Sequence, residues 1–211
     1  MPHKLLEIYE TLADHYGPRG WWPAASPFEV VVGAILTQNT AWRNVEKAIA
    51  NLKQLGPLTP EALVRLPEET LSDAIRPSGY YRRKTTRLRN FLDLLSNGFQ
   101  CRLDSLFDLP TEALREELLA VSGIGPETAD SILLYAAERP VFVIDAYTIR
   151  ILSRHQLLPE ETSYAEAQQW VTDHLPEDVQ LFNEFHALLV AVGKDFCRPR
   201  PKCPGCPLEG S

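Results

Sequence analysis

Residues 121–148 read VSGIGPETADSILLYAAERPVFVIDAYT, and this stretch decides the fold. Two glycines flank Ile124 and separate an apolar helical pattern over residues 111–121 from a second pattern that begins at Pro126. Glycine lets the backbone approach another group closely, and the exposed amides at the start of a helix attract anions. The pattern predicts a helix-hairpin-helix that grips the phosphate backbone of a nucleic acid. The predicted contacts are Gly123, Ile124, Gly125 and Thr128.

An ordinary glycine-capped helix end followed by a new helix would explain the same glycines. The next segment, RPVFVIDAYTIRIL (139–152), adds a short apolar run that ends in Asp145, and this aspartate alone could be a helix N-cap. In order, however, the hairpin, the apolar run and the aspartate resemble the helix-hairpin-helix/Gly-Pro-Asp superfamily of DNA glycosylases, specifically its endonuclease III branch. The resemblance covers nearly the whole chain.

Three further segments carry the same resemblance. FEVVVGAILTQNTAWRNVEKAI (28–49) is similar to a buried helix and glutamine turn, which implies that Gln38, with Asn39 beside it, fills the space left by an extruded nucleotide. SGYYRRKTTRL (78–88) implies Tyr80 as a wedge in the duplex and Lys84 as a contact to the DNA backbone. GKDFCRPRPKCPGCP (193–207) looks like the C-terminal iron-sulfur loop of the branch.

The charge distribution bears on this interpretation. The chain has a net charge of −7, which by itself argues against binding a polyanion. Basic residues nevertheless gather between Arg76 and Arg89, where no acid occurs, and again around the cysteines. A solvated helix face is the alternative explanation of the first cluster. Aromatic residues beside it, at a turn, favour a loop that probes a duplex.

Helical periodicity runs throughout, so we expect an all-α protein. By resemblance, residues 27–138 form a six-helix barrel with the hairpin, and residues 1–26 and 139–211 form a second helical domain with the aspartate and the cysteine loop. DNA would lie in the cleft between them. The expected helices are 4–16, 27–38, 41–54, 60–66, 68–75, 81–97, 111–121, 126–137, 146–155, 163–175 and 178–193.

Asp145 and Glu127 are the candidate catalytic residues. A carboxylate beneath the sugar stabilises the positive charge that develops when an N-glycosidic bond breaks, and can orient or deprotonate water. Bifunctional members of the branch carry a lysine in the second hairpin helix, and Glu127 takes that position here. No lysine occurs between Leu103 and Glu138. Since a carboxylate cannot form a Schiff base, we expect a monofunctional glycosylase without efficient lyase activity.

The base pocket is predicted from aromatic residues near the first buried helix. This region resembles that of the 3-methyladenine glycosylases of the branch, which implies that Trp22 and Pro23 stack on an alkylated purine with Trp42 opposite. A methylated purine is cationic and is attracted to an aromatic face. The alternative is that these tryptophans only pack helices.

Cys197, Cys203 and Cys206 are spaced almost as in the cluster loop of the branch, which implies a [4Fe–4S] cluster. The branch has a fourth cysteine about six residues further on, and the sequence ends at Ser211 before that position. Cys101 is far away, so either the chain is truncated or the cluster is incomplete. Zinc and reduced thiols stay open as alternatives. No organic cofactor is expected.

The expected function is therefore excision of alkylated purines from double-stranded DNA with a damaged base, by a monomer. Removal of mismatched thymine or uracil, or of damaged pyrimidines, is the enzymatic alternative, and a non-catalytic helix-hairpin-helix DNA-binding protein is the alternative of another class. Neither a membrane segment nor a signal-peptide core is evident, so we expect a cytoplasmic protein associated with the nucleoid.

Overall fold

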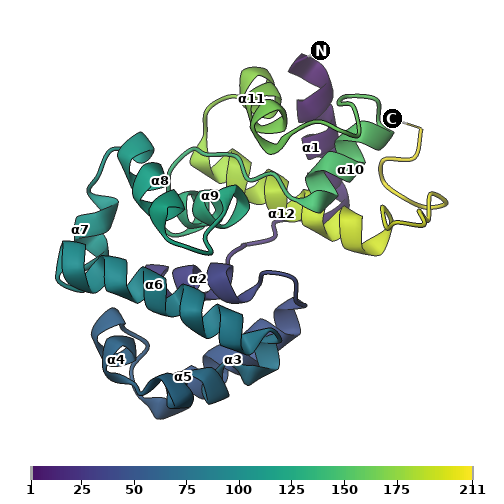
Figure 1. Cartoon of the computed structure of the whole chain (residues 1–211). Coiled ribbons are helices and arrows are strands. Elements are labelled where there is room, and N and C mark those ends of the chain that lie inside the picture. The colour runs from purple at the N-terminus through teal and green to yellow at the C-terminus, as the bar shows by residue number, and fades with distance from the viewer. Residues whose placement is uncertain (1, 211) are drawn as a thin grey trace. The chain divides into compact units, whose positions relative to one another are not determined.

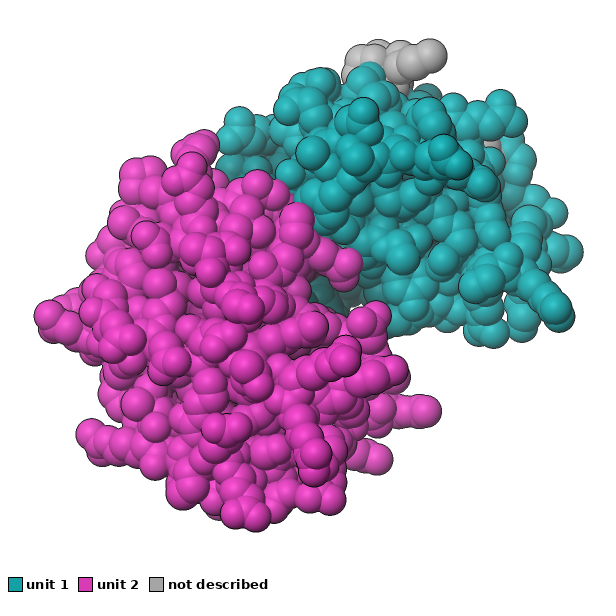
Figure 2. All heavy atoms as spheres, in the orientation of Figure 1, with its two compact units in different colours: residues 1–22, 138–211 teal, residues 23–137 magenta. Residues whose placement is uncertain are grey.

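The computed structural model describes residues 2–210, and within this range every element of regular structure is a helix (Figure 1). The all-α class predicted from the sequence is thus confirmed. The chain divides into two compact units, coloured separately in Figure 2. Unit 1 comprises residues 1–22 and 138–211, and unit 2 comprises residues 23–137. None of the helices within residues 2–210 combines the length and the apolar character needed to span a bilayer.

Unit 2 contains the helices from α2 to α9, and α2 forms its centre. Every residue of α2 from Phe28 to Leu36 is buried, and the helix packs against α3, α6 and α9. A helix that is apolar on all sides is stable only when neighbours surround it, which explains this position. The elements are α2 (Pro27–Leu36), α3 (Trp42–Leu55), α4 (Pro60–Arg65), α5 (Glu68–Ala74), the 3₁₀ helix η1 (Arg76–Ser78), α6 (Tyr81–Phe99), α7 (Leu103–Phe107), α8 (Thr111–Ala120) and α9 (Pro126–Tyr135).

Unit 1 joins the N-terminal helix to the C-terminal third of the chain. The long helix α12 (Val179–Asp195) packs against α1 (Pro2–Tyr16) and α10 (Ala146–Arg154), and α1 also packs against α11 (Tyr164–His174). Three phenylalanines form an aromatic centre: the ring of Phe142 lies edge-on to the rings of Phe182 and Phe185, at 5.3 and 5.9 Å between centroids. Such edge-to-face pairs are favourable beyond the apolar area that they bury.

Local sequence signals explain most helix starts. Ser26 and Thr59 accept hydrogen bonds from amides in the first turns of α2 and α4, and each precedes a proline at the first helical position. Thr111, which we expect from the sequence to cap this helix, is instead its first residue, and Pro110 is the N-cap of α8. The short helix α7 was not predicted, because five residues are too few to show helical periodicity.

Candidate active site

Asp145 is the N-cap of α10, and only one of its carboxylate oxygens is committed to that role. Oδ1 accepts hydrogen bonds from the amide and the hydroxyl of Thr148, at 2.7 and 2.9 Å. Oδ2 lies 3.7 Å from Nε2 of His186, a residue of α12, and the carboxylate side chain keeps 12% of its surface exposed. The cap fixes the carboxylate rigidly while Oδ2 stays available for chemistry.

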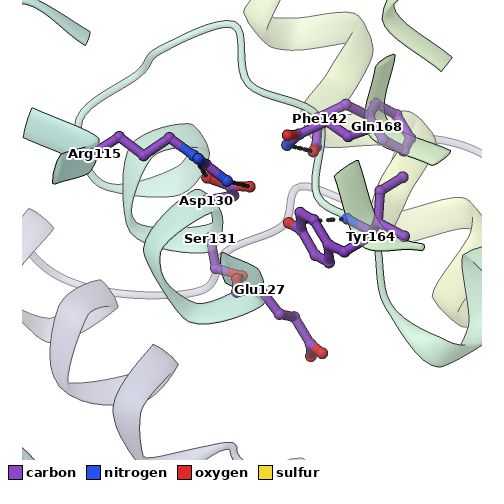
Figure 3. Close-up of polar contacts among 8 residues, drawn as sticks. Arg115, Glu127, Asp130, Ser131, Phe142, Tyr164 and Gln168 are labelled. Atoms are coloured by element: carbon purple, nitrogen blue, oxygen red, sulfur yellow. Dashed lines mark hydrogen bonds and ion pairs between the residues drawn. The ribbon is translucent and has the colours of Figure 1, made fainter. Parts of the chain in front are cut away.

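The extended segment before Asp145 is held by side chains of α11. Nε2 of Gln168 donates to the carbonyl of Phe142 at 2.7 Å, and the amide of Ile144 donates to the hydroxyl of Tyr164 at 3.4 Å (Figure 3). Phe142 itself is buried in the aromatic centre of unit 1. The position of the carboxylate is therefore fixed both by the cap after it and by the anchored strand-like segment before it.

The surroundings of Asp145 favour its charged form. Burial raises the pKa of this carboxyl, but the nearby imidazole of His186 and the two hydrogen bonds from Thr148 outweigh burial and hold the pKa below its ordinary value. Asp145 is thus an ionised carboxylate at neutral pH. His186 was not assigned to the site from the sequence, since no local pattern connects two residues that are 41 positions apart.

The two hairpin glycines differ in why they must be glycine. Gly123 has a φ of +96°, and a Cβ there would lie 3.0 Å from Cδ of Arg87 and closer still to its Cγ. Gly125 has a φ of −96°, and a Cβ there would meet nothing within 4 Å. The fold therefore requires glycine at position 123 but not at position 125. Ile124 between them is buried, so its side chain supports the turn from inside the unit.

Gln38 connects the turn after α2 with the hairpin. Its Nε2 donates to the carbonyl of Gly123 at 3.2 Å and to Oγ1 of Thr128 at 2.8 Å, while its Oε1 accepts from Arg87. From the sequence we expect Gln38 and Thr128 to contact DNA, and Arg87 has no individual role there. In the free protein the two predicted residues bond to each other, and any entry of Gln38 into a duplex would first have to break these bonds.

Two predicted DNA-contact residues are exposed on turns of unit 2. Tyr80 is 69% exposed and has a φ of +45°, directly after Gly79 at +69°. Asn39 is exposed with a φ of +53°. Non-glycine residues rarely adopt this left-handed conformation, and where they do the surrounding structure holds them in it.

Lys84 corrects a prediction. The resemblance implies that its ammonium contacts the DNA backbone, but the residue is 1% exposed. Its Nζ donates to the carbonyls of Leu36 and Ser78, at 2.8 and 2.7 Å. Lys84 precedes Leu88 by four positions and so lies on the buried face of α6, which also carries Phe91 and Leu95. Helical spacing could have revealed this burial, but the contact was assigned from the resemblance alone.

Glu127 lies in the first turn of α9 and is exposed. Figure 3 shows its carboxylate directed away from Asp130, which is fully buried on the same helix. Asp130 accepts two hydrogen bonds from Arg115 of α8, at 2.7 and 3.1 Å. This pair, with its two hydrogen bonds, connects the helices on either side of the hairpin turn. Glu127 stands at the position where the resemblance implies a lysine in bifunctional enzymes.

The predicted base pocket is divided between the units. Trp22 is half-buried at the end of the first segment of unit 1, where its ring lies 5.1 Å from that of Trp21. Pro23 and Trp42 belong to unit 2, and Trp42 is also half-buried. Joint stacking of the three residues on one base stays a prediction.

The three C-terminal cysteines line one cavity of unit 1, with a volume of about 460 Å³. Arg154 donates to Sγ of Cys197 at 3.3 Å and to the carbonyls of Arg198 and Pro199, and Arg150 donates to the carbonyl of Cys197. Cys101 lies in unit 2, and the four thiols are all free. Among residues 2–210, no three His, Cys, Asp or Glu side chains lie close enough together to hold a metal ion.

Comparison with known proteins decides the family. The profile of the HhH-GPD superfamily of base excision DNA repair proteins matches residues 32–177, which is more than half of the chain. The chain belongs to the HhH-GPD superfamily. A candidate DNA repair glycosylase of Methanocaldococcus jannaschii is 44% identical to this HhH-GPD protein over 206 residues, 97% of this chain and 94% of that protein. Endonuclease III of Thermotoga maritima is 31% identical over 185 residues, 87% of this chain and 81% of that enzyme.

Solved structures agree with this assignment. The 3-methyladenine DNA glycosylase of H. pylori, bound to 1,N6-ethenoadenine, is 29% identical and superposes with a TM-score of 0.77 over 90% of this chain and 97% of that one. An endonuclease III trapped as a covalent DNA intermediate superposes with a TM-score of 0.84 over 99% and 93% of the two chains, at 21% identity, and shows the shared fold. The resemblance stated from sequence is therefore confirmed, and the HhH-GPD protein is a DNA glycosylase of base excision repair.

Proposed function

We propose that this HhH-GPD protein is a monofunctional DNA glycosylase that removes alkylated purines from duplex DNA by hydrolysis. The observation that carries the proposal is the ionised carboxylate of Asp145, with Oδ2 available, in a chain that has Glu127 in place of a lysine. The C1′–N bond breaks and its electrons leave with the base. Water then adds to C1′, and its proton passes to Asp145.

The nature of the base makes this mechanism sufficient. A purine methylated at a ring nitrogen carries a positive charge, so it departs as a neutral base and needs no acid to protonate it. The developing charge on the sugar is stabilised by the Asp145 carboxylate. Trp22, Pro23 and Trp42 are the proposed stacking residues. The likeness to the H. pylori enzyme, whose structure holds a modified adenine, supports a purine substrate.

The hairpin supplies the proposed grip on DNA. The fold itself leaves space for a side chain at Gly125, and a glycine there would let a phosphate approach the start of α9 closely. Helix N-termini present unpaired amides and a positive dipole end, both of which suit a phosphate. Tyr80, exposed on its turn, is the proposed wedge.

A [4Fe–4S] cluster in the C-terminal loop is part of the proposal. Burial raises the pKa of the Cys206 thiol, and the neighbouring thiols of Cys197 and Cys203 raise it further. The three cysteines line one cavity, and thiolates are the usual ligands of an iron-sulfur cluster. When bound, the cluster would order the loop, whose backbone Arg150 and Arg154 already hold.

The cluster proposal has a matched control in Cys101, which lies outside the loop. We expect anaerobically purified full-length protein to contain iron and sulfide, and Cys203→Ser to lose most of both. Cys101→Ser should retain them. Equal iron content in the two variants would contradict the assignment of the loop as the cluster site.

Substrate and reaction type are tested together on short duplexes. The duplexes contain 3-methyladenine, 7-methylguanine, a G·T or G·U mismatch, or thymine glycol, and alkali reveals abasic sites after incubation. We expect abasic sites from the methylated purines, no strand cleavage without alkali, and no covalent adduct when borohydride is present. Release of thymine or uracil alone would favour the mismatch alternative. A borohydride-trapped adduct would refute the monofunctional mechanism.

A further inference from the structure

Three polar side chains follow each other at three-residue intervals along α6: Lys84 is buried, and Arg87 and Asn90 are half-buried. Lys84 bonds to the carbonyls of Leu36 and Ser78, Arg87 bonds to Gln38, and Asn90 donates to the carbonyl of Ser122 at 2.9 Å. Each of these bonds ends on or beside one of the turns that carry the predicted DNA contacts. α6 thus connects the Gln38 turn, the Tyr80 turn and the hairpin, all within unit 2.

Lys84 is the member that joins two turns through one atom. Leu36 is the last residue of α2, two positions before Gln38, and Ser78 is the last residue of η1, two positions before Tyr80. A single ammonium at 2.8 and 2.7 Å from the two carbonyls therefore sets the separation of the two turns. Burying a charge is costly unless it is hydrogen-bonded. Leu88, one helical turn after Lys84 on the same face of α6, is a buried apolar residue of the kind usual there.

The Tyr80 turn has a particular need for such a support. Gly79 and Tyr80 have successive φ values of +69° and +45°, and Tyr80 has a largely exposed ring, so its own side chain contributes little packing. Strained backbone persists only where the surroundings fix it. The hydroxyl of Ser78, which donates to the carbonyl of Ile75 at 2.7 Å, fixes the turn from one side, and Lys84 fixes it from the other.

From this geometry we infer that Lys84 is a positioning residue: it holds the Tyr80 wedge and the Gln38 turn at the fixed spacing needed to enter a duplex together. The inference rests on the proposed function, because it takes Tyr80 as the wedge. Lys84 itself makes no contact with DNA in this account. Its neutral form would retain two N–H donors for the same two carbonyls, so the link does not depend on the charge.

Hydrogen exchange tests the structural half of the inference without DNA. In full-length Lys84→Met, the amides of residues 37–39 and 78–81 should exchange about tenfold faster or more. This factor corresponds to the loss of one hydrogen bond from a charged donor. The exchange of amides in α8 and α9 should not change. Lys47→Met, at an exposed lysine of α3, is the control. Lys84→Gln gives a second variant if methionine prevents folding. Unchanged exchange in both turns, or equal acceleration throughout unit 2, would overturn the inference.

A double-mutant cycle with Tyr80 tests the functional half. The probe is a duplex with 2-aminopurine beside a tetrahydrofuran abasic-site analogue, whose fluorescence rises when the wedge unstacks the probe. Tyr80→Ala and Lys84→Met should each abolish most of this rise, and the double variant should lose no more than either alone. A full rise in Lys84→Met that still depends on Tyr80 would overturn the inference. A full rise in Tyr80→Ala would overturn it too, together with the assignment of Tyr80 as the wedge. Neither result would affect the proposed base excision, which is measured by base release.

Discussion

The hairpin glycines allow a prediction whose magnitude follows from the geometry. In Gly123→Ala, an L residue must adopt a φ of +96°, which costs about 1–3 kcal/mol. The new methyl group also displaces Arg87 and so removes its hydrogen bond to Gln38, which costs roughly 1 kcal/mol more. We therefore expect the free energy of unfolding to fall by about 2–4 kcal/mol. At Gly125, where space and φ both suit alanine, the same change should stabilise by up to about 1 kcal/mol.

The two variants should show the opposite order in DNA binding. Alanine at position 125 places a methyl group where a phosphate is proposed to approach, so its dissociation constant for an undamaged duplex should rise about tenfold, the equivalent of one good hydrogen bond. Urea denaturation measures stability, and fluorescence anisotropy of a labelled duplex measures binding. Equal stability of the two variants would refute the structural reasoning, and tight binding by Gly125→Ala would refute a phosphate contact at that residue.

Three further predictions concern buried charges. Burial lowers the pKa of Lys84 from 10.5 to about 8, and the nearby charge of Arg87 lowers it further. Between these two pH values the unfolded chain binds more protons than the folded one, so the free energy of unfolding should rise with pH from about 8 to 10.5. Urea denaturation of Lys84→Met should lack this rise. Burial raises the pKa of Asp145 and His186 opposes it, so His186→Gln should move the acid limb of the pH–rate profile for base release to higher pH, and an unmoved limb would exclude this influence. Arg115→Met removes the side chain that donates two hydrogen bonds to the fully buried Asp130, so the free energy of unfolding, measured by heat or urea, should fall by about 3 kcal/mol. A fall below about 1 kcal/mol would show that the pair is not important for stability.

Local rules made much of the fold predictable. Capping by Ser26, Thr59 and Asp145, and proline at the first position of α9, are decided by atoms within four residues, so the sequence displays them directly. The short helix α7 has no comparable signal. The class and the order of the elements followed from the same local periodicity.

The site was harder to predict because its contacts join distant segments. His186 meets Asp145 and Arg87 meets Gln38 across 41 and 49 positions, and no single-sequence pattern specifies such pairs. Lys84 illustrates a different difficulty: the resemblance placed its ammonium on the DNA backbone, while helical spacing places this side chain in the interior. A positive charge in a sequence indicates its chemistry but not the direction in which it points.

The central claim is that the Asp145 carboxylate performs the chemistry, and single-turnover base release by Asp145→Asn tests it most directly. Asparagine is as good an N-cap as aspartate, so α10 should stay intact. Asp178→Asn is the matched control, since Asp178 caps α12 through the same kind of bond, 2.7 Å from the amide of Leu181. We predict that release from a duplex containing 3-methyladenine falls about 10²–10⁴-fold in Asp145→Asn, with duplex affinity and the control variant unchanged. Release at the wild-type rate by Asp145→Asn would contradict the account.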